Sequence, residues 1–311
     1  MFVDLAVVAA GLLQCHRDSI HHNRAAALDP GDDLGRVVVF VGDDRFGPLA
    51  FQQSDRMWCY FNPMPSFLQR GIGRLRERMK RPVRHFNMYI PHVKDKAGLE
   101  IGGPSETFRA RDILPIYQFV GSLDNCDFSS STVWGEHAQR FHFLAEKAPG
   151  RSIFCDGSNL NPVASGTYDF VLSSHNLEHF ANPVRALYEW KRVLRPGGAI
   201  ILILPYYKST FDHRRTPTPA AAMLDDFQRN IGEDDLSHLP EILEKHDLAL
   251  DPGAGSLENF HKRSLDNVNN RCLHHHVFDQ HNIRELLMSI KFEVLAVDLV
   301  LPMHICVLAR V

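Results

Sequence analysis

The sequence is poor in cysteine and contains no CxxC pair. Six cysteines are scattered over 311 residues. This usage argues against a zinc finger and against a disulfide-dense scaffold, because both need cysteines at closely spaced positions. It is typical of a protein that stays in a reducing compartment, so we expect a cytoplasmic location.

An excess of charge of one sign is also missing. The formal net charge is only −3, which gives no global attraction to nucleic acid or to an anionic membrane. The apolar stretch at residues 2–15 is too short to span a bilayer. It contains Asp4, and no Lys or Arg precedes it, so it does not match a secretory signal. We therefore expect no nucleic-acid partner and no membrane partner.

One run, Tyr168 to Pro205, contains a complete strand–helix–turn–strand unit. The apolar residues 170–172 are too few for a helix and suit a strand that is buried on both faces. Residues 183–195 alternate apolar and charged side chains at helical spacing. A proline and two glycines follow and predict the end of this helix. The apolar residues 199–205 then predict a second strand, which makes the run a βαβ crossover.

Two motifs in this run carry a family resemblance. LEH at residues 177–179, followed by LRPGG at residues 194–198, resembles the region of the fourth and fifth strands in class I S-adenosylmethionine-dependent methyltransferases of the type 11 group. The resemblance implies an α/β fold: a Rossmann-like sheet of seven strands with an antiparallel last strand and helices on both faces. It also implies S-adenosyl-L-methionine as the cofactor.

A glycine turn that suits this cofactor lies upstream, in GLEIGGPS at residues 98–105. In the family, the turn after the first strand brings the backbone close to the methionine part of the cofactor, and an acidic residue contacts its charged end through water or directly. A proline stands at the second glycine of the usual family pattern, and this form resembles a bacterial subgroup with the motif LEIGGPS. The predicted cofactor contacts in the turn are Glu100, Gly102, Gly103 and Ser105.

Two further carboxylates follow predicted strands. The resemblance implies an acid at the end of the second strand for the ribose hydroxyls, and Asp124 fits because it follows Gly102 by 22 positions, near the roughly 20 expected. Asp127 is the competing candidate. A second acid should follow the third strand and meet the adenine amino group, and Asp156 fits this place. The remaining predicted cofactor contacts are Gly157 and Ser174.

The rest of the chain departs from the minimal fold. We expect residues 1–63 to be an N-terminal extension and residues 64–311 to be the methyltransferase domain. Residues 206–270 form an acidic insertion after the fifth strand. Because open α/β sheets bind ligands beyond the carboxyl ends of their strands, we expect this α-helical insertion to be a substrate cap. A helix that starts at Asp279 and two apolar segments should complete the sheet.

Methyl transfer to a hydroxyl or an amine removes a proton, and a histidine near the methyl group is a suitable base. Three histidines that lie after a predicted strand or before the last helix are the candidates: His175, His213 and His276. Residues 274–276 are all histidine. Consecutive residues do not readily converge on one ion, so we predict no metal site.

The predicted function is methyl transfer to an oxygen or nitrogen atom of a small molecule, with a glycan or a secondary metabolite as the class of substrate. A non-catalytic protein that binds the cofactor is the first alternative, because methyl transfer has no obligatory side-chain signature. A NAD-dependent oxidoreductase is disfavoured, because the strand before the glycine turn ends in Glu100 and the spacing GxGxxG is absent. The sequence does not indicate an oligomeric state.

Overall fold

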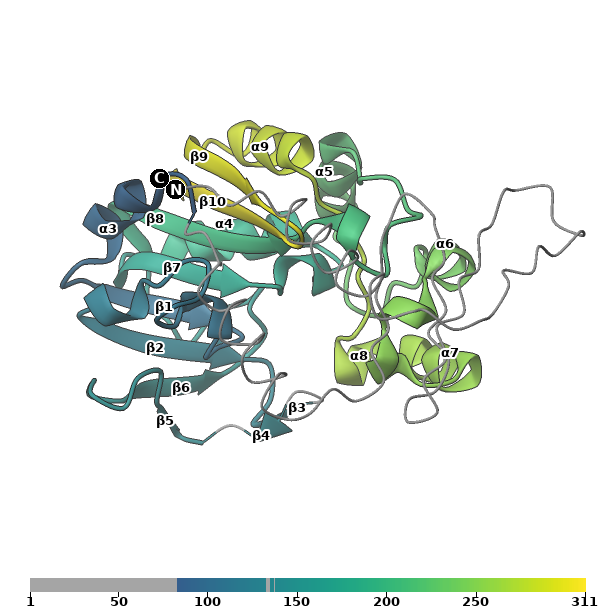
Figure 1. Cartoon of the computed structure of the whole chain (residues 1–311), viewed down its shortest axis with the longest axis horizontal. Coiled ribbons are helices and arrows are strands. Elements are labelled where there is room, and N and C mark those ends of the chain that lie inside the picture. Colours follow the sequence, from purple (N-terminus) through teal and green to yellow (C-terminus); the bar gives the residue numbers. More distant parts are fainter. Residues whose placement is uncertain (1–82, 133–134, 137) are drawn as a thin grey trace, which may run out of the picture. The chain divides into compact units, whose positions relative to one another are not determined.

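The computed structural model describes residues 83–311, apart from residues 133, 134 and 137. The predicted extension at residues 1–63, and with it the predicted domain boundary, lies outside the described residues. The described part is a mixed β-sheet covered by helices, which confirms the predicted fold class (Figure 1). None of its helices combines the length and the apolar composition that a bilayer crossing requires.

Eight strands form the sheet, in the order β5-β6-β2-β1-β7-β8-β10-β9. Their bounds are β1 Ala97–Ile101, β2 Ser122–Asp127, β5 Arg140–Phe141, β6 Gly150–Phe154, β7 Tyr168–Ser174, β8 Leu194–Pro205, β9 Glu293–Val300 and β10 His304–Arg310. Strands β6, β2, β1, β7 and β8 are parallel, and the last strand, β10, is antiparallel to both β8 and β9, as predicted. The sheet has one strand more than the predicted seven, because the short β5 pairs with the edge of β6. A separate hairpin consists of β3 (Ser131–Thr132) and β4 (Gly135–Glu136).

Helices cover both faces of the sheet because its central strands are apolar on both faces. One apolar cluster joins the sheet to α4 (Pro183–Val193), α5 (Ala220–Gln228) and α9 (Gln280–Ser289). The cluster on the other face contains residues of α3 (Phe86–Val93) and of the 3₁₀ turns η1 (Glu106–Phe108) and η2 (Tyr117–Phe119). The parallel strands are thus buried between two layers, as their near-continuous apolar sequences require.

The βαβ unit forms where the sequence predicts it, with one local difference. Helix α4 ends at Val193, and the strand β8 already begins at Leu194. The pairing of β7 with β8 then shifts, so that four residues, 195–198, bulge out of the ladder. Gly197 has a φ of +75° in this bulge, a backbone conformation that favours glycine. The predicted turn is therefore a bulge inside the strand.

The last helix starts as predicted. Asp279 is the N-cap of α9, and its carboxylate accepts hydrogen bonds from the backbone of His281 and Asn282. The Asn282 side chain accepts in return from the backbone N–H of Asp279 at 2.9 Å, which completes a capping box.

The first α-helix of the insertion, α5, packs on the main core, and the later helices of the insertion form a small apolar core of their own. Its other helices are α6 (Leu239–Lys245), α7 (Leu257–Leu265) and α8 (Asn267–Asn270), with the short 3₁₀ turns η4 (Tyr207–Ser209), η5 (Leu248–Leu250) and η6 (Pro252–Ala254). Ala220 and Met223 of α5 belong to the main core. Leu239, Ile242 and Phe260 form a small core of their own. Figure 1 shows α6, α7 and α8 beyond the carboxyl ends of the parallel strands.

The tight contact between β1 and β7 gives a first prediction. A Cβ atom added to Gly98 would lie 2.1 Å from the ring of Phe170. We expect Gly98→Ala to lower the free energy of unfolding by about 1–3 kcal/mol, because overpacking strains a close-packed core. Urea unfolding measures the change. Gly253→Ala in η6, where the nearest atom is 3.5 Å away, is the control and should stay within about 0.5 kcal/mol of the wild type. Equal stability of both variants would contradict this close packing.

Candidate functional site

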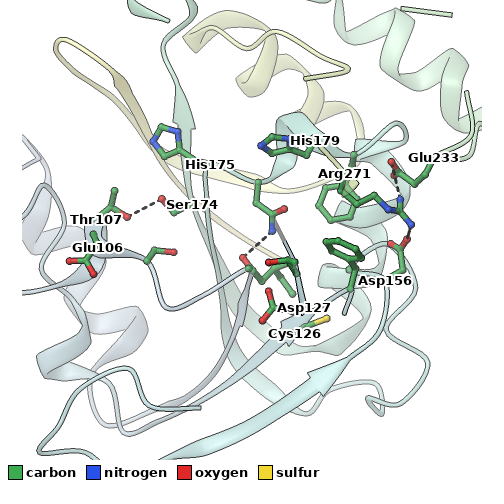
Figure 2. A pocket seen from close by; sticks show the side chains of 18 residues that line it. Glu106, Thr107, Cys126, Asp127, Asp156, Ser174, His175, His179, Glu233 and Arg271 are labelled. Carbon is green, nitrogen blue, oxygen red and sulfur yellow. Dashed lines mark hydrogen bonds and ion pairs between the residues drawn. The ribbon is translucent and has the colours of Figure 1, made fainter. Parts of the chain in front are cut away.

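A cavity of about 370 Å³ opens at the carboxyl ends of β1, β2, β6 and β7 (Figure 2). Most of its wall comes from the residues that directly follow these strands, and two residues come from the insertion and the loop behind it. The lining residues are Ile101, Gly102, Ser105, Glu106, Thr107, Cys126, Asp127, Phe128, Thr132, Asp156, Gly157, Ser174, His175, Asn176, His179, Phe180, Glu233 and Arg271.

The glycine turn presents bare backbone to this cavity. Gly102 has a φ of +76°, and a Cβ atom on it would lie 2.9 Å from the side-chain nitrogen of Asn176. That nitrogen donates a hydrogen bond to the carbonyl of Ile101 at 3.0 Å, so Asn176 has little freedom to give way. Gly102 and Ser105 both line the cavity, in agreement with their predicted place.

Glu100 and Gly103 lie beneath the turn and outside the cavity lining. The Glu100 carboxylate is fully buried and accepts hydrogen bonds from the N–H and Oγ of Ser105, at 3.1 and 2.7 Å, and from the Tyr117 hydroxyl, at 2.6 Å. A Cβ atom on Gly103 would lie 2.3 Å from this carboxyl group. The structure thus gives the Glu100 carboxylate a role in holding the turn, and its predicted contact with the cofactor, through water or direct, stays a prediction. Its carboxylate accepts the three hydrogen bonds that hold the turn.

Burial has an electrostatic consequence at Glu100. Desolvation raises the pKa of this carboxyl group to about 7, and it outweighs the hydrogen bonds from Tyr117 and Ser105, which lower the pKa. This carboxyl group is consequently partly protonated near neutral pH.

The structure also corrects the predicted place of Asp124 at the end of the second strand, whereas the ribose contact itself stays a prediction. Asp124 lies in the middle of β2, where its carboxylate accepts hydrogen bonds from Arg151 Nη2 at 2.8 Å and from the Tyr168 hydroxyl at 2.7 Å. Burial raises the pKa of Asp124, but these hydrogen bonds hold it below its usual value. The strand continues for three residues to Asp127, which lines the cavity. The acid at the end of the strand is therefore Asp127, the competing candidate.

Asp156 follows β6 and takes part in a bridge across the cavity. One carboxylate oxygen accepts from the N–H and Oγ of Ser158, at 2.8 and 2.7 Å, and the other accepts from Arg271 at 3.1 Å. Arg271 also pairs with Glu233 at 3.0 Å, and its guanidinium lies over the ring of Phe128. Figure 2 shows this bridge between the insertion and the strand ends. Sequence reasoning missed Arg271 and Glu233, because neither stands in a motif.

The two other predicted cofactor contacts line the cavity as well. The carbonyl of Gly157 accepts a hydrogen bond from Trp190 Nε1 of α4 at 2.9 Å, which ties the loop after β6 to the core. The Ser174 hydroxyl at the end of β7 is 2.9 Å from the Thr107 hydroxyl. Both residues connect the cavity wall to buried elements.

Of the three histidines predicted as bases, the structure brings His175 to the cavity. Its Nε2 lies 2.9 Å from Nδ1 of His304. Burial, together with the neighbouring His304 and His274, lowers the pKa of His175 to about 3, so its imidazole is neutral at neutral pH. His179, which sequence reasoning did not select, also lines the cavity. Its place in the LEH motif was the available signal.

His213 and His276 do not line the cavity. His213 Nε2 lies 2.9 Å from the carboxylate of Asp247, at the surface of the insertion. His276 is fully buried, and its Nε2 lies 3.2 Å from the carbonyl of Ala181. The chain thus turns the His276 side chain into the protein interior.

Residues 118–202 match the family model of a methyltransferase domain. Similar solved structures include S-adenosylmethionine-dependent methyltransferases from Mesorhizobium loti (14% identity, 73% of this chain and 95% of that chain, TM-score 0.43) and from Aquifex aeolicus (13% identity, 75% and 95%, TM-score 0.39). A third is the trans-methyltransferase CalH in complex with S-adenosylhomocysteine (18% identity, 78% of this chain and 55% of that chain, TM-score 0.38). A search of curated proteins gave no match.

The raised pKa of Glu100 predicts a pH-dependent stability. In the folded protein Glu100 keeps its proton up to about pH 7, whereas its ordinary value is 4.5. Between these values the unfolded chain has lost a proton that the folded protein retains, so stability falls as the pH rises. Glu100→Gln removes this loss. We expect the stability of the variant relative to the wild type to increase by roughly 2–3 kcal/mol from about pH 5 to about pH 8, measured by urea unfolding.

Glu244→Gln, at an exposed position of α6, is the control for the general loss of a carboxylate. A constant difference between Glu100→Gln and the wild type at both pH values would show that Glu100 ionises equally in the folded and unfolded states.

Proposed function

We propose that the chain is a class I S-adenosylmethionine-dependent methyltransferase, with S-adenosylmethionine as its cofactor, and that it methylates an oxygen or nitrogen atom of a small molecule. The observation that carries this proposal is the cavity at the strand ends, where Asp127 ends β2, Asp156 follows the neighbouring β6, and the glycine turn follows β1. Ligands of open α/β sheets bind at this edge. The cytoplasmic location also remains a proposal. It is supported by the free thiols of the four cysteines in the described part of the chain.

The cavity residues fit the parts of the cofactor. The bare backbone at Gly102 admits the methionine part, because no side chain occupies that place. The carboxylate of Asp127 suits the ribose hydroxyls, since a carboxylate accepts two hydrogen bonds. Asp156 suits the adenine amino group, and the ring of Phe128 beside it offers an apolar face. When bound, S-adenosylmethionine supplies a methyl group that is already activated on a positively charged sulfur.

The protein then has to hold the acceptor and keep water out. The bridge from Arg271 to Asp156 and Glu233 covers the cavity from the side of the insertion. It limits the space for the acceptor, which supports a small molecule. Among the described lining residues, the carboxylates of Glu106, Asp127, Asp156 and Glu233 outnumber the guanidinium of Arg271. This balance disfavours a strongly anionic acceptor such as nucleic acid.

His175 is the residue that we propose acts on the acceptor. Its neutral imidazole at the cavity wall accepts a hydrogen bond from a hydroxyl or an amine, which orients the acceptor atom. An acceptor that carries a proton to lose matches this arrangement, and it is the reason for proposing oxygen or nitrogen as the methylated atom.

A labelling experiment tests the proposed activity. The purified protein is incubated with a small-molecule extract and S-adenosylmethionine that carries a labelled methyl group, and products are detected by their mass shift. We expect at least one labelled small molecule, which is absent when the protein is omitted. Saturable binding of S-adenosylhomocysteine without any labelled product would favour the non-catalytic alternative.

The place of Asp127 predicts which carboxylate supports cofactor affinity. Asp127→Asn weakens hydrogen bonds to the ribose, and a hydrogen bond to a charged group contributes about 1.5–3 kcal/mol, so affinity for S-adenosylhomocysteine should fall about tenfold or more. Asp124→Asn is the matched control. It removes the Arg151 ion pair and should lower stability but leave affinity unchanged. Calorimetric titration measures both affinities, and the reverse result would return the ribose contact to Asp124.

A further inference from the structure

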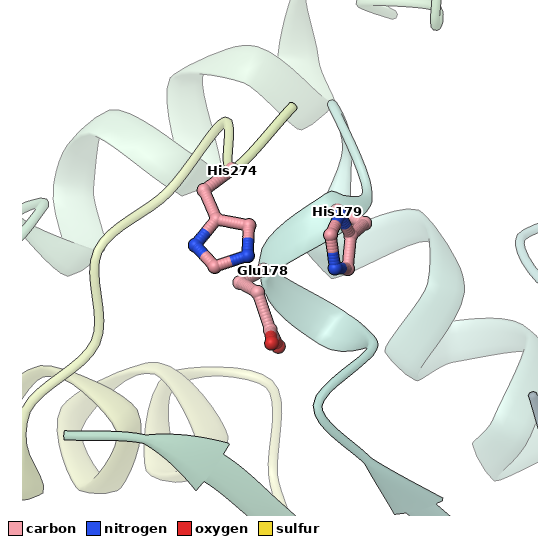
Figure 3. Close-up of side chains that lie close together, drawn as sticks. All are labelled: Glu178, His179 and His274. Atoms are coloured by element: carbon pink, nitrogen blue, oxygen red, sulfur yellow. The ribbon is translucent and has the colours of Figure 1, made fainter. Parts of the chain in front are cut away.

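We propose that Glu178, His179 and His274 hold a divalent transition-metal ion, such as Zn²⁺, at the wall of the cavity. A carboxylate oxygen and two imidazole nitrogens, one atom from each residue, lie within 4.8 Å of one another. Figure 3 shows the two imidazole rings on either side of the Glu178 side chain. Two histidines and one carboxylate are a donor set that suits Zn²⁺ and related ions, and three protein ligands leave positions open for a further ligand.

The Glu178 carboxylate needs a positive partner. The side chain is 1% exposed, and neither of its oxygens has a partner with normal hydrogen-bond geometry in the described part of the chain. The backbone N–H groups of Asn176 and of Glu178 itself interact with the carboxyl group only outside that geometry. Nδ1 of His175 lies 3.9 Å from one of them, beyond hydrogen-bonding distance. A buried acceptor without a donor is strongly unfavourable and rare in native proteins. A cation between Glu178 and the two imidazoles would satisfy it.

Both imidazoles are held in the orientation that metal binding requires. Nδ1 of His274 lies 2.6 Å from the carboxylate of Asp212, and Nδ1 of His179 lies 3.2 Å from the carbonyl of Leu273. Each acceptor fixes the proton on Nδ1, so that Nε2 carries the lone pair. Metal-binding histidines almost always donate their other ring N–H to a carboxylate, a carbonyl or water in this way.

A buried arginine fixes the loop that carries His274. The Arg215 side chain is 1% exposed and donates hydrogen bonds to the carboxylate of Asp212 at 3.0 Å and to the carbonyls of His274 and His275 at 2.7 and 3.1 Å. The charge of Asp212 is thereby balanced by Arg215. Glu178, by contrast, is paired with no arginine or lysine in the described part of the chain, and its contact with His175 is long, at 3.9 Å.

This proposal revises the expectation that the chain has no metal site. The consecutive histidines at residues 274–276 do not converge on one position, because the structure places His274 and His276 in two different groups. Only His274 joins Glu178 and His179, which lie on η3 (Leu177–His179), far away in the sequence.

The structure contains another group of ligand types, Asp226, His238 and His276. There the carboxylate of Asp226 already accepts a hydrogen bond from Arg229 at 2.6 Å, whose guanidinium supplies positive charge. This group therefore has less need of an ion, and it provides the comparison for an experiment.

The position of the ion also indicates what its open sites would bind. His179 lines the cavity, so the ion would lie at the cavity wall, and hard or borderline divalent ions take oxygen ligands. We assign the open sites to an oxygen atom of the methyl acceptor, which the ion would orient together with His175. This last step rests on the proposed function, whereas the metal site itself does not.

Metal titration of the full chain tests the site. The purified protein is freed of metal with a chelator and titrated with Zn²⁺ and, as a spectroscopic probe, with Co²⁺. We expect saturable binding of a single ion and the visible absorption of Co²⁺ with nitrogen and oxygen ligands. Asp212→Asn should weaken binding about 10–100-fold, and Glu178→Gln and His274→Gln should weaken it more, because they remove ligands. His238→Gln should leave the affinity and the spectrum unchanged.

Two measurements keep the outcome clear if a variant folds poorly. X-ray absorption at the zinc edge of the wild-type protein gives the ligand set without any substitution, and we expect two imidazoles and oxygen donors. Titration with S-adenosylhomocysteine shows separately whether each variant retains the cofactor site. A wild-type protein that binds neither ion, unchanged binding in Glu178→Gln, or loss confined to His238→Gln would overturn the proposal without affecting the proposed methyl transfer.

Discussion

The buried carboxylate of Glu100 is the interaction on which the cavity depends. It lies at the end of the central strand β1, and its three hydrogen bonds from Ser105 and Tyr117 form only when the glycine turn folds back over it. Asn125 of β2 stabilises the same turn. Its side chain accepts a hydrogen bond from the N–H of Gly103 at 2.8 Å and donates one to the carbonyl of Gly103 at 3.3 Å. Because a buried carboxylate without donors is very unfavourable, Glu100 couples the shape of the glycine turn to the stability of the sheet.

The insertion is held to the strand ends by charges as well as by apolar contacts. Arg215 and Asp212 form a buried ion pair within it, and Arg271, which directly follows it, connects its Glu233 to Asp156 after β6. Removing one partner of a buried pair leaves an unpaired charge, which destabilises a protein by about 3–5 kcal/mol. Arg271 at the cavity therefore also helps to hold the insertion to the strand ends, together with the apolar contacts of α5 with the main core.

Local sequence patterns predict much of the fold, whereas contacts between distant parts of the chain determine which residues line the candidate site. The βαβ unit and the start of α9 at Asp279 follow from periodicity and capping, which are properties of neighbouring residues. The choice between Asp124 and Asp127 depends on where β2 ends, and β2 reaches Asp127 because this residue pairs with Phe154 of β6. Arg271 reaches Asp156 from a loop that precedes the last helix. No local motif reports such a contact, so sequence reasoning could not find it.

The segment that follows β7 connects the two halves of the candidate site. Asn176 holds the carbonyl that precedes the glycine turn, whereas Glu178 and His179 face the proposed metal position. Between Ser174 and Asn176 the chain changes direction at His175, whose φ of +49° is uncommon for a residue with a side chain. A hydrogen bond from its N–H to the carbonyl of Ile203 at 2.7 Å stabilises this conformation. A few residues with fixed backbone thus set the separation between the cofactor turn and the metal position, and a methyl donor and its acceptor need such a fixed separation.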